Sequence, residues 1–276
     1  MGPLGLVGTR VLRHPVALVR VCRVPWYEVI ALLAAGMAAG TVNTIVGAGT
    51  LITFPTLLFF GFPPLVANVS NTVGLVAGGI TGIHGYRREL VGQSGVVRRL
   101  MPMSFVGAVT GAILLLWLPE SAFDAIVPAL IAASVLLVML GPRLQAWAAA
   151  RHPDHESRGR RLVLGVGVFG AGVYGGYFGA AQGVLLVGIM SVLMTISLQR
   201  INGLKNVLAT VANVVAAVIF ILVAPDRIDW AVAALIAVGA LAGGYVGARF
   251  GRRLSPVALR GLIVVVGVLV IGKMVL

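Results

Sequence analysis

The sequence predicts an all-α polytopic membrane protein built from two similar halves. Hydrophobic residues make up 59% of its 276 residues and charged residues only 11%, which is more apolar surface than one soluble core needs. No Asp, Glu, Lys or Arg occurs between Val29 and Tyr86, or between Leu162 and Gln199. Since a membrane helix needs about 20 apolar residues, each of these gaps must hold more than one helix. The lipid bilayer is the predicted environment, and the cytoplasmic membrane the predicted location.

Apolar segments follow one another along the whole chain. They lie near 27–47, 49–62, 65–86, 100–118, 122–142, 162–180, 183–197, 201–224, 230–248 and 256–275. The second and seventh are too short to span a bilayer. The second is bounded by Gly47-Ala48-Gly49 and by Gly61-Phe62-Pro63-Pro64, which interrupt helices. We therefore expect about eight transmembrane helices and two short re-entrant or broken helices.

The positive charges lie between the apolar segments. Residues 1–26 form a basic leader, and basic residues also fill the loop around Arg87 to Arg99 and the linker 150–161. The positive-inside rule places these segments in the cytoplasm, although the Arg249 to Arg253 cluster would then lie outside. This pattern accounts for the net charge of +13 without nucleic acid, and we expect no nucleic-acid partner.

The two halves resemble each other at a spacing of about 134 residues, the distance from Asn68 to Asn202. The first transmembrane repeat is predicted at 27–149 and the second at 162–276. With four crossings in each half, the repeats are expected to be related in parallel. Transporters with internal repeats often bind their substrate where the halves meet.

The glycine-rich breaks are candidate binding sites. Non-helical backbone at membrane depth is tolerated only where it is buried in protein or lines a water-filled cavity. The helix that follows a break directs the positive end of its dipole toward the break, which favours an anion. Close packing of helices by small residues is the alternative reading. The predicted substrate-binding residues at the two breaks are Asn43, Gly47, Gly49, Thr50, Tyr177, Gly179 and Gln182.

Lys205 lies in an otherwise apolar segment, where a lysine costs about 2.5–3.5 kcal/mol. Asn202 and Asn206 share its helical face, and Asn68 and Asn71 occupy the same positions in the first half. An anionic substrate would compensate the cost. The alternative is that Lys205 extends its ammonium to the membrane interface.

Other chemistries find little support in the sequence. The acidic residues lie in loops or at segment ends, which argues against a cation substrate. His84 is the single candidate for a proton relay, and a hydrogen-bonded interfacial histidine is the alternative. With one cysteine, Cys22, and no nucleophile paired with a base, we expect no metal, no cofactor and no enzyme activity.

Several motifs together resemble a known family. They are Asn43 through Pro55, Gly61 through Pro64, Ala67 through Thr72, Gly85 through Arg88, Tyr174 through Gly179, and Asn202 through Asn206. In this order they resemble the sulfite exporter TauE/SafE family, over about residues 27 to 275. In the first break, Gly47-Ala48-Gly49-Thr50 stands where that family usually has three or four consecutive glycines.

The resemblance implies export of sulfite, sulfoacetate or a related small sulfur-containing anion. Two alternatives remain open from the sequence. One is an uptake permease or channel for another small anion, and the other is a membrane protein that assembles or anchors a partner without transport. A homo-oligomer is compatible with either reading.

Overall fold

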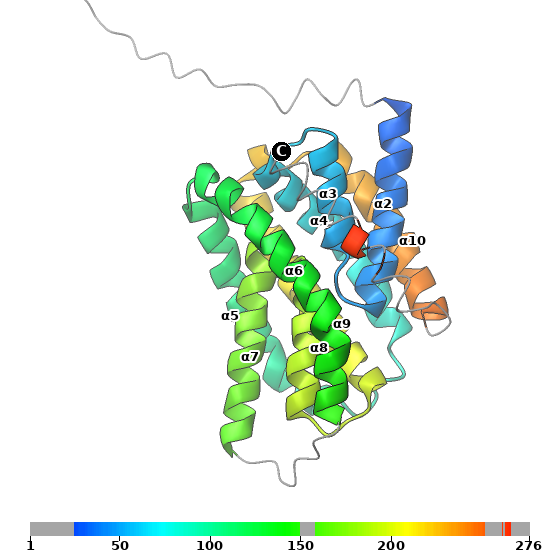
Figure 1. Cartoon of the computed structure of the whole chain (residues 1–276), viewed down its shortest axis with the longest axis vertical. Helices are drawn as coiled ribbons and strands as arrows, with labels where there is room; N and C mark the ends of the chain where they lie inside the picture. Colours follow the sequence, from blue (N-terminus) through cyan, green and yellow to red (C-terminus); the bar gives the residue numbers. More distant parts are fainter. Residues whose placement is uncertain (1–24, 150–157, 252–260, 262, 266–276) are drawn as a thin grey trace, which may run out of the picture.

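The computed structural model describes residues 25–149, 158–251, 261 and 263–265 (Figure 1). Within these residues the chain is helical and has no strand. The helices in chain order are α2 (Trp26–Ile45), α3 (Thr50–Phe59), α4 (Pro64–Gly85), α5 (Ser94–Trp117), α6 (Glu120–Ala149), α7 (Arg158–Tyr177), α8 (Gln182–Leu193), α9 (Leu198–Val223), the 3₁₀ turn η1 (Pro225–Arg227) and α10 (Trp230–Phe250).

Six of the described helices, α2, α4, α5, α6, α9 and α10, are long and apolar enough to cross a bilayer. The prediction of an all-α multi-pass membrane protein is therefore confirmed. Helix α7 is 20 residues long, but its arginines and glycines lower its apolar character. The expected last segment, 256–275, lies almost wholly outside the described residues, as does most of the leader 1–26. The number of about eight crossings stays a prediction.

The two short helices occur where the sequence predicts them. Helix α3 has 10 residues and α8 has 12, so at 1.5 Å per residue each covers about half of a hydrocarbon core about 30 Å thick. After α2 the chain turns back, because Gly49 lies against the Ala39 carbonyl and the Asn43 side chain. After α7 it turns back in the same way, and Gln182 packs on Gly175.

The direction of the helices corrects one expectation. Gly36 and Gly40 of α2 lie beside Ile236 and Ala240 of α10, so these two helices run in the same direction. Helix α4 also runs with α10, because Gly78 lies beside Ala240 and Gly85 beside Ala248.

Helices α5, α7 and α9 run the opposite way. Gly107 and Gly111 of α5 meet Phe169 and Val173 of α7 in the same order along both helices. Helices α2 and α7, the first of each half, are thus antiparallel (Figure 1). These directions do not fit the expectation that the halves are related in parallel, because α3 reverses the chain between α2 and α4 and so leaves α7 running opposite to α2. The repeat itself stays a prediction.

Helices from different halves touch through backbone atoms. A Cβ atom at Gly40 in α2 would overlap the Ala240 carbonyl in α10, and one at Gly111 in α5 would overlap the Val173 carbonyl in α7. The Thr41 hydroxyl also donates to the Gly243 carbonyl at 3.0 Å. Small residues allow such close approach, which is how membrane helices gain packing energy without a hydrophobic driving force.

An apolar cluster, here termed the lower core, lies between α5, α7, α8 and α9. Its largest buried members are Leu100, Leu164, Val168, Leu186, Val187, Met190, Ile201, Leu204 and Leu208. A larger cluster extends from α2, α3 and α4 to α6 and α10. This larger cluster also contains the break residues Ala48, Phe178, Ala180 and Ala181.

Candidate functional site

The helices α2 and α7 end in the same local structure. Gly47 follows α2 with φ +88° and Gly179 follows α7 with φ +73°, a region that glycine adopts without strain. The N–H of Gly47 donates to the Val42 carbonyl at 3.1 Å, and that of Gly179 to the Tyr174 carbonyl at 2.9 Å. Such glycine caps close a helix by using its last free carbonyls.

The two breaks are in direct contact. The Gly183 N–H, at the start of α8, donates to the Gly47 carbonyl at 3.0 Å. A Cβ atom on Gly47 would overlap the Cα atom of Gly183, and a Cβ on Gly183 would overlap Gly47 in turn. Only glycine at both positions permits this approach. The contact brings the starts of α3 and α8 to one place, and no side chain caps either helix start.

The contact between the two breaks is here termed the junction. Lys205 of α9 lies at this junction. Its side chain is fully buried, and Nζ donates to the carbonyls of Asn43 at 3.0 Å and Thr44 at 2.8 Å. The amide of Asn206 adds a longer contact of 3.4 Å to the Thr44 carbonyl. The ammonium therefore sits at the negative end of the α2 dipole, which stabilises a buried positive charge. It does not extend to the membrane interface, the alternative left open by the sequence.

Asn68 of α4 contacts the end of α7, as Lys205 contacts the end of α2. Its side-chain amide donates to the Tyr177 carbonyl, at the end of α7, at 3.0 Å, and Asn68 is 1% exposed. Thus Asn68 of the first half binds the end of α7, and Lys205 of the second half binds the end of α2. The first contact is neutral and the second is charged, so the two sides of the junction differ chemically.

Asn71 lies one turn after Asn68 and joins α4 to α3. Its amide donates to the Thr50 hydroxyl at 3.2 Å, and its Oδ1 accepts a short hydrogen bond from the Thr53 hydroxyl. All three side chains are buried. These hydrogen bonds fix the start of the short helix α3 relative to the junction.

Two buried polar atoms at the junction have no hydrogen-bond partner among the described residues. They are Oδ1 of Asn68 and Nε2 of Gln182, both on side chains at most 2% exposed. An unpaired buried polar group costs about 1–3 kcal/mol, so these atoms are suited to bind a ligand. Asn68 lies at the end of α7, the Gln182 side chain packs on Gly175, and Lys205 lies beside Gly183.

The structure does not bring every predicted site residue to the junction. His84 is exposed at the end of α4, where its carbonyl accepts from Arg87 at 3.0 Å. Asn202 is half-buried in the first turns of α9, and Asn43 contributes its carbonyl. Tyr177 likewise contributes its carbonyl, while its ring packs on Phe123.

Two residues at the junction were missed by sequence reasoning. Thr44 supplies the carbonyl closest to Lys205, and Thr53 binds Asn71. A backbone carbonyl leaves no signal in the sequence. Thr53 could have been found, because it lies one turn after Thr50 in an apolar segment and thus on the same helical face.

A substitution of Asn68 tests its contact with α7. We expect Asn68→Ala to lower the free energy of unfolding by about 1–3 kcal/mol, because it leaves the Tyr177 carbonyl buried without its donor. The measurement is the midpoint of thermal unfolding of the purified protein in detergent. Asn202→Ala, at the half-buried position 134 residues later, is the control and should change the midpoint little. Equal shifts in both variants would contradict this role of Asn68.

A comparison with known protein families shows to which family the chain belongs. The family model described as "Sulfite exporter TauE/SafE" matches residues 32–274. The chain belongs to the sulfite exporter TauE/SafE family. The resemblance seen in the sequence motifs is thereby confirmed, and the match includes both breaks and the junction between them.

Curated relatives of the TauE/SafE protein are named as membrane transporters. A "Probable membrane transporter protein YfcA" of Escherichia coli (strain K12) is 28% identical over 246 residues, which cover 86% of each chain. A "Probable membrane transporter protein" of Haemophilus influenzae is 24% identical over 88% of this chain and 93% of the relative. A third, "Probable membrane transporter protein ORF9" of Sinorhizobium sp, is 27% identical over 86% and 88%. No solved structure matches the chain.

Proposed function

We propose that this TauE/SafE protein exports a small sulfur-containing anion, with sulfite or sulfoacetate as the first candidates, across the cytoplasmic membrane. The observation that carries the proposal is the fully buried Lys205 ammonium at the contact of the two helix breaks. Helix-end carbonyls offset only part of a full positive charge. A bound anion would neutralise the remainder, and the free Nε2 of Gln182 would donate a hydrogen bond to it.

The mechanism follows from the closed state of the junction. Lys205, Asn71 and Gln182 are at most 2% exposed, so binding and release require α3 or α8 to move away from the junction. We propose that the halves are inverted repeats and that α3 opens the site to one side of the membrane and α8 to the other. Alternating access in such transporters is the movement of one repeat relative to the other around a fixed site.

The energetics favour export without a coupled ion. A membrane potential that is negative inside drives a monovalent anion outward by about 2.3 kcal/mol per 100 mV. The predicted absence of a mid-membrane carboxylate agrees with a carrier that uses this potential. The relatives named as probable membrane transporters support transport as such. The sulfur-containing cargo is supported by the description of the family.

The test is efflux of radiolabelled sulfite and sulfoacetate from proteoliposomes that carry an inside-negative potassium diffusion potential. We expect saturable efflux, accelerated by unlabelled anion outside and absent from protein-free vesicles. Efflux that rises linearly with concentration and shows no exchange would indicate a channel instead. If neither anion leaves the vesicles faster than from protein-free controls, the proposed cargo is wrong.

A further inference from the structure

The two ends of the helix bundle carry opposite charges. At one end, here termed the arginine end, α2, α4, α6 and α10 finish and α5, α7 and α9 begin. Among the described residues, every arginine except Arg227 lies in the turns or loops of this end, and every acidic residue except Glu89 lies at the other, the acidic end. The arginines concerned are Arg87, Arg88, Arg98, Arg99, Arg143, Arg158, Arg160, Arg161, Arg200 and Arg249. Basic loops of membrane proteins stay in the cytoplasm, which favours the arginine end as the cytoplasmic side.

The two short helices lead from the junction to opposite ends of the bundle. Helix α8 starts at the junction, and its last residue, Leu193, lines a cavity with Val96 of α5 and Leu164 of α7 at the arginine end. Helix α3 also starts beside the junction, but it leads to Pro64, where α4 begins at the acidic end. Helix α8 therefore covers the junction toward the arginine end, and α3 covers it toward the acidic end.

Polar contacts hold α3 more firmly than α8. The hydroxyls of Thr50 and Thr53 in α3 share hydrogen bonds with Asn71 of α4. In α8, Nε2 of Gln182 and Oγ of Ser191 are buried and have no hydrogen-bond partner in the described part of the chain. Each unpaired group costs about 1–3 kcal/mol in the closed state, and water would pair both groups once α8 moved. This difference makes α8 the easier of the two short helices to displace.

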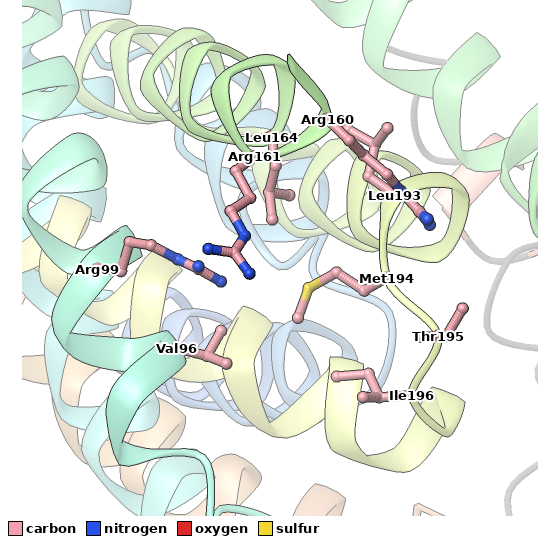
Figure 2. A pocket seen from close by; sticks show the side chains of 9 residues that line it. All are labelled: Val96, Arg99, Arg160, Arg161, Leu164, Leu193, Met194, Thr195 and Ile196. Carbon is pink, nitrogen blue, oxygen red and sulfur yellow. The ribbon is translucent and has the colours of Figure 1, made fainter. Parts of the chain in front are cut away.

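The cavity at the arginine end leaves space beside the end of α8. It has a volume of about 90 Å³, and the loop after α8 forms one of its walls through Met194, Thr195 and Ile196. Figure 2 shows Met194 facing Val96 and Arg99 of α5 across this space. Because a closely packed interior resists displacement, the end of α8 can shift into this space at a lower cost than into packed side chains.

We propose that the arginine end faces the cytoplasm and that α8 is the gate through which the anion enters from that side, whereas α3 opens to the outside. The gate rests on the export proposed above, but the orientation does not. In this orientation α2 begins outside, and Arg249, which the sequence places outside, lies in the cytoplasm because α3 reverses the chain. A Cβ atom on Gly183 of α8 would lie 2.9 Å from Cδ of Lys205, so an anion that passes α8 meets the ammonium directly.

The orientation is tested by labelling single cysteines in intact bacterial cells with a membrane-impermeant maleimide. The background is Cys22→Ser, which removes the one native cysteine. Ser94 at the start of α5 and Ser121 in the first turn of α6 are exposed at the arginine end and at the acidic end, respectively. We expect Ser121→Cys to be labelled in intact cells and Ser94→Cys only after the cells are permeabilised. The reverse pattern, or equal labelling of both in intact cells, would overturn the orientation.

Buried cysteines in the same background test the gate. Met190 of α8 and Leu57 of α3 are both 0% exposed, so they react only when their helix moves. Met190→Cys should react with the maleimide in inside-out membrane vesicles alone, and Leu57→Cys in right-side-out vesicles alone. Leu32→Cys, equally buried in α2, is the control and should react in neither. The opposite pattern, no reaction of Met190→Cys from either side, or equally fast reaction of Leu32→Cys would overturn the gate role of α8.

A disulfide tests whether transport needs this movement. A Cβ atom at Gly167 of α7 would lie 2.9 Å from Cγ2 of Ile189 in α8, so cysteines at both positions are close enough to be bridged. Efflux of sulfoacetate through oxidised Gly167→Cys/Ile189→Cys should fall at least about tenfold and recover on reduction. Sulfite is not used, because it cleaves disulfides. Equal efflux in both states would overturn the gate role, whereas no efflux through the wild type would contradict the proposed cargo and leave the labelling to decide orientation and gate.

Discussion

Replacing Gly47 by alanine is expected to lower the free energy of unfolding by about 2–5 kcal/mol. A side chain in the left-handed region costs about 1–2 kcal/mol, and forcing an extra methyl group into a packed contact costs about 1–3 kcal/mol. Both terms act here, because Gly47 has φ +88° and its Cβ would overlap Gly183. The measurement is the thermal midpoint of the purified protein in detergent, read from the folded peak in size-exclusion chromatography.

Gly61 provides the matched control for this variant. It also has a positive φ, +78°, but a Cβ atom there would meet nothing within 4 Å. Gly61→Ala should therefore show the backbone cost alone, about 1–2 kcal/mol. Midpoints that fall equally in Gly47→Ala and Gly61→Ala would show that the contact between the two breaks contributes nothing to stability.

Replacing Lys205 by glutamine is expected to lower sulfite efflux by about 10- to 100-fold while leaving the protein folded. The glutamine amide can still donate to the Asn43 or Thr44 carbonyl, so the end of α2 keeps a donor. What is lost is the positive charge, and a hydrogen bond to a charged group contributes about 1.5–3 kcal/mol. The measurement is the initial rate of potential-driven efflux from proteoliposomes with equal amounts of folded protein.

Arg200→Gln is the control for Lys205→Gln. It removes the same charge from the same helix, but at an exposed position in the first turn of α9. Its efflux should stay close to that of the wild type, apart from a small effect of surface charge. If Lys205→Gln transports as fast as Arg200→Gln, the anion does not bind the lysine, and the glycine-rich breaks become the remaining candidates.

Much of the fold could be predicted from local sequence. The short helices α3 and α8 follow from glycine and proline on both sides of apolar runs that are too short to cross a membrane. Lys205 and Asn68 also stand out in the sequence as polar residues in apolar segments, while their role in substrate binding stays a prediction. Both are buried at the junction.

What could not be predicted depends on contacts between distant segments. The partners of Lys205 are carbonyls 161 and 162 residues away, and a carbonyl is the same at every position. The opposite directions of α2 and α7 could not be predicted from loop charges, because a short helix such as α3 reverses the chain without adding a charged loop. Direction becomes evident only from pairs such as Gly40 with Ala240 and Gly111 with Val173.

The packing of α2 on α10 has a consequence for biosynthesis. Thr41 and Gly243, which are joined across this contact, are separated by 202 residues. At a synthesis rate of about 5–20 residues per second, α2 emerges roughly 10–40 s before its partner. Through that interval the small-residue face of α2 must meet lipid, an insertase or a transient neighbour. Truncated chains that end before α10 should therefore be preferred targets of membrane quality-control proteases.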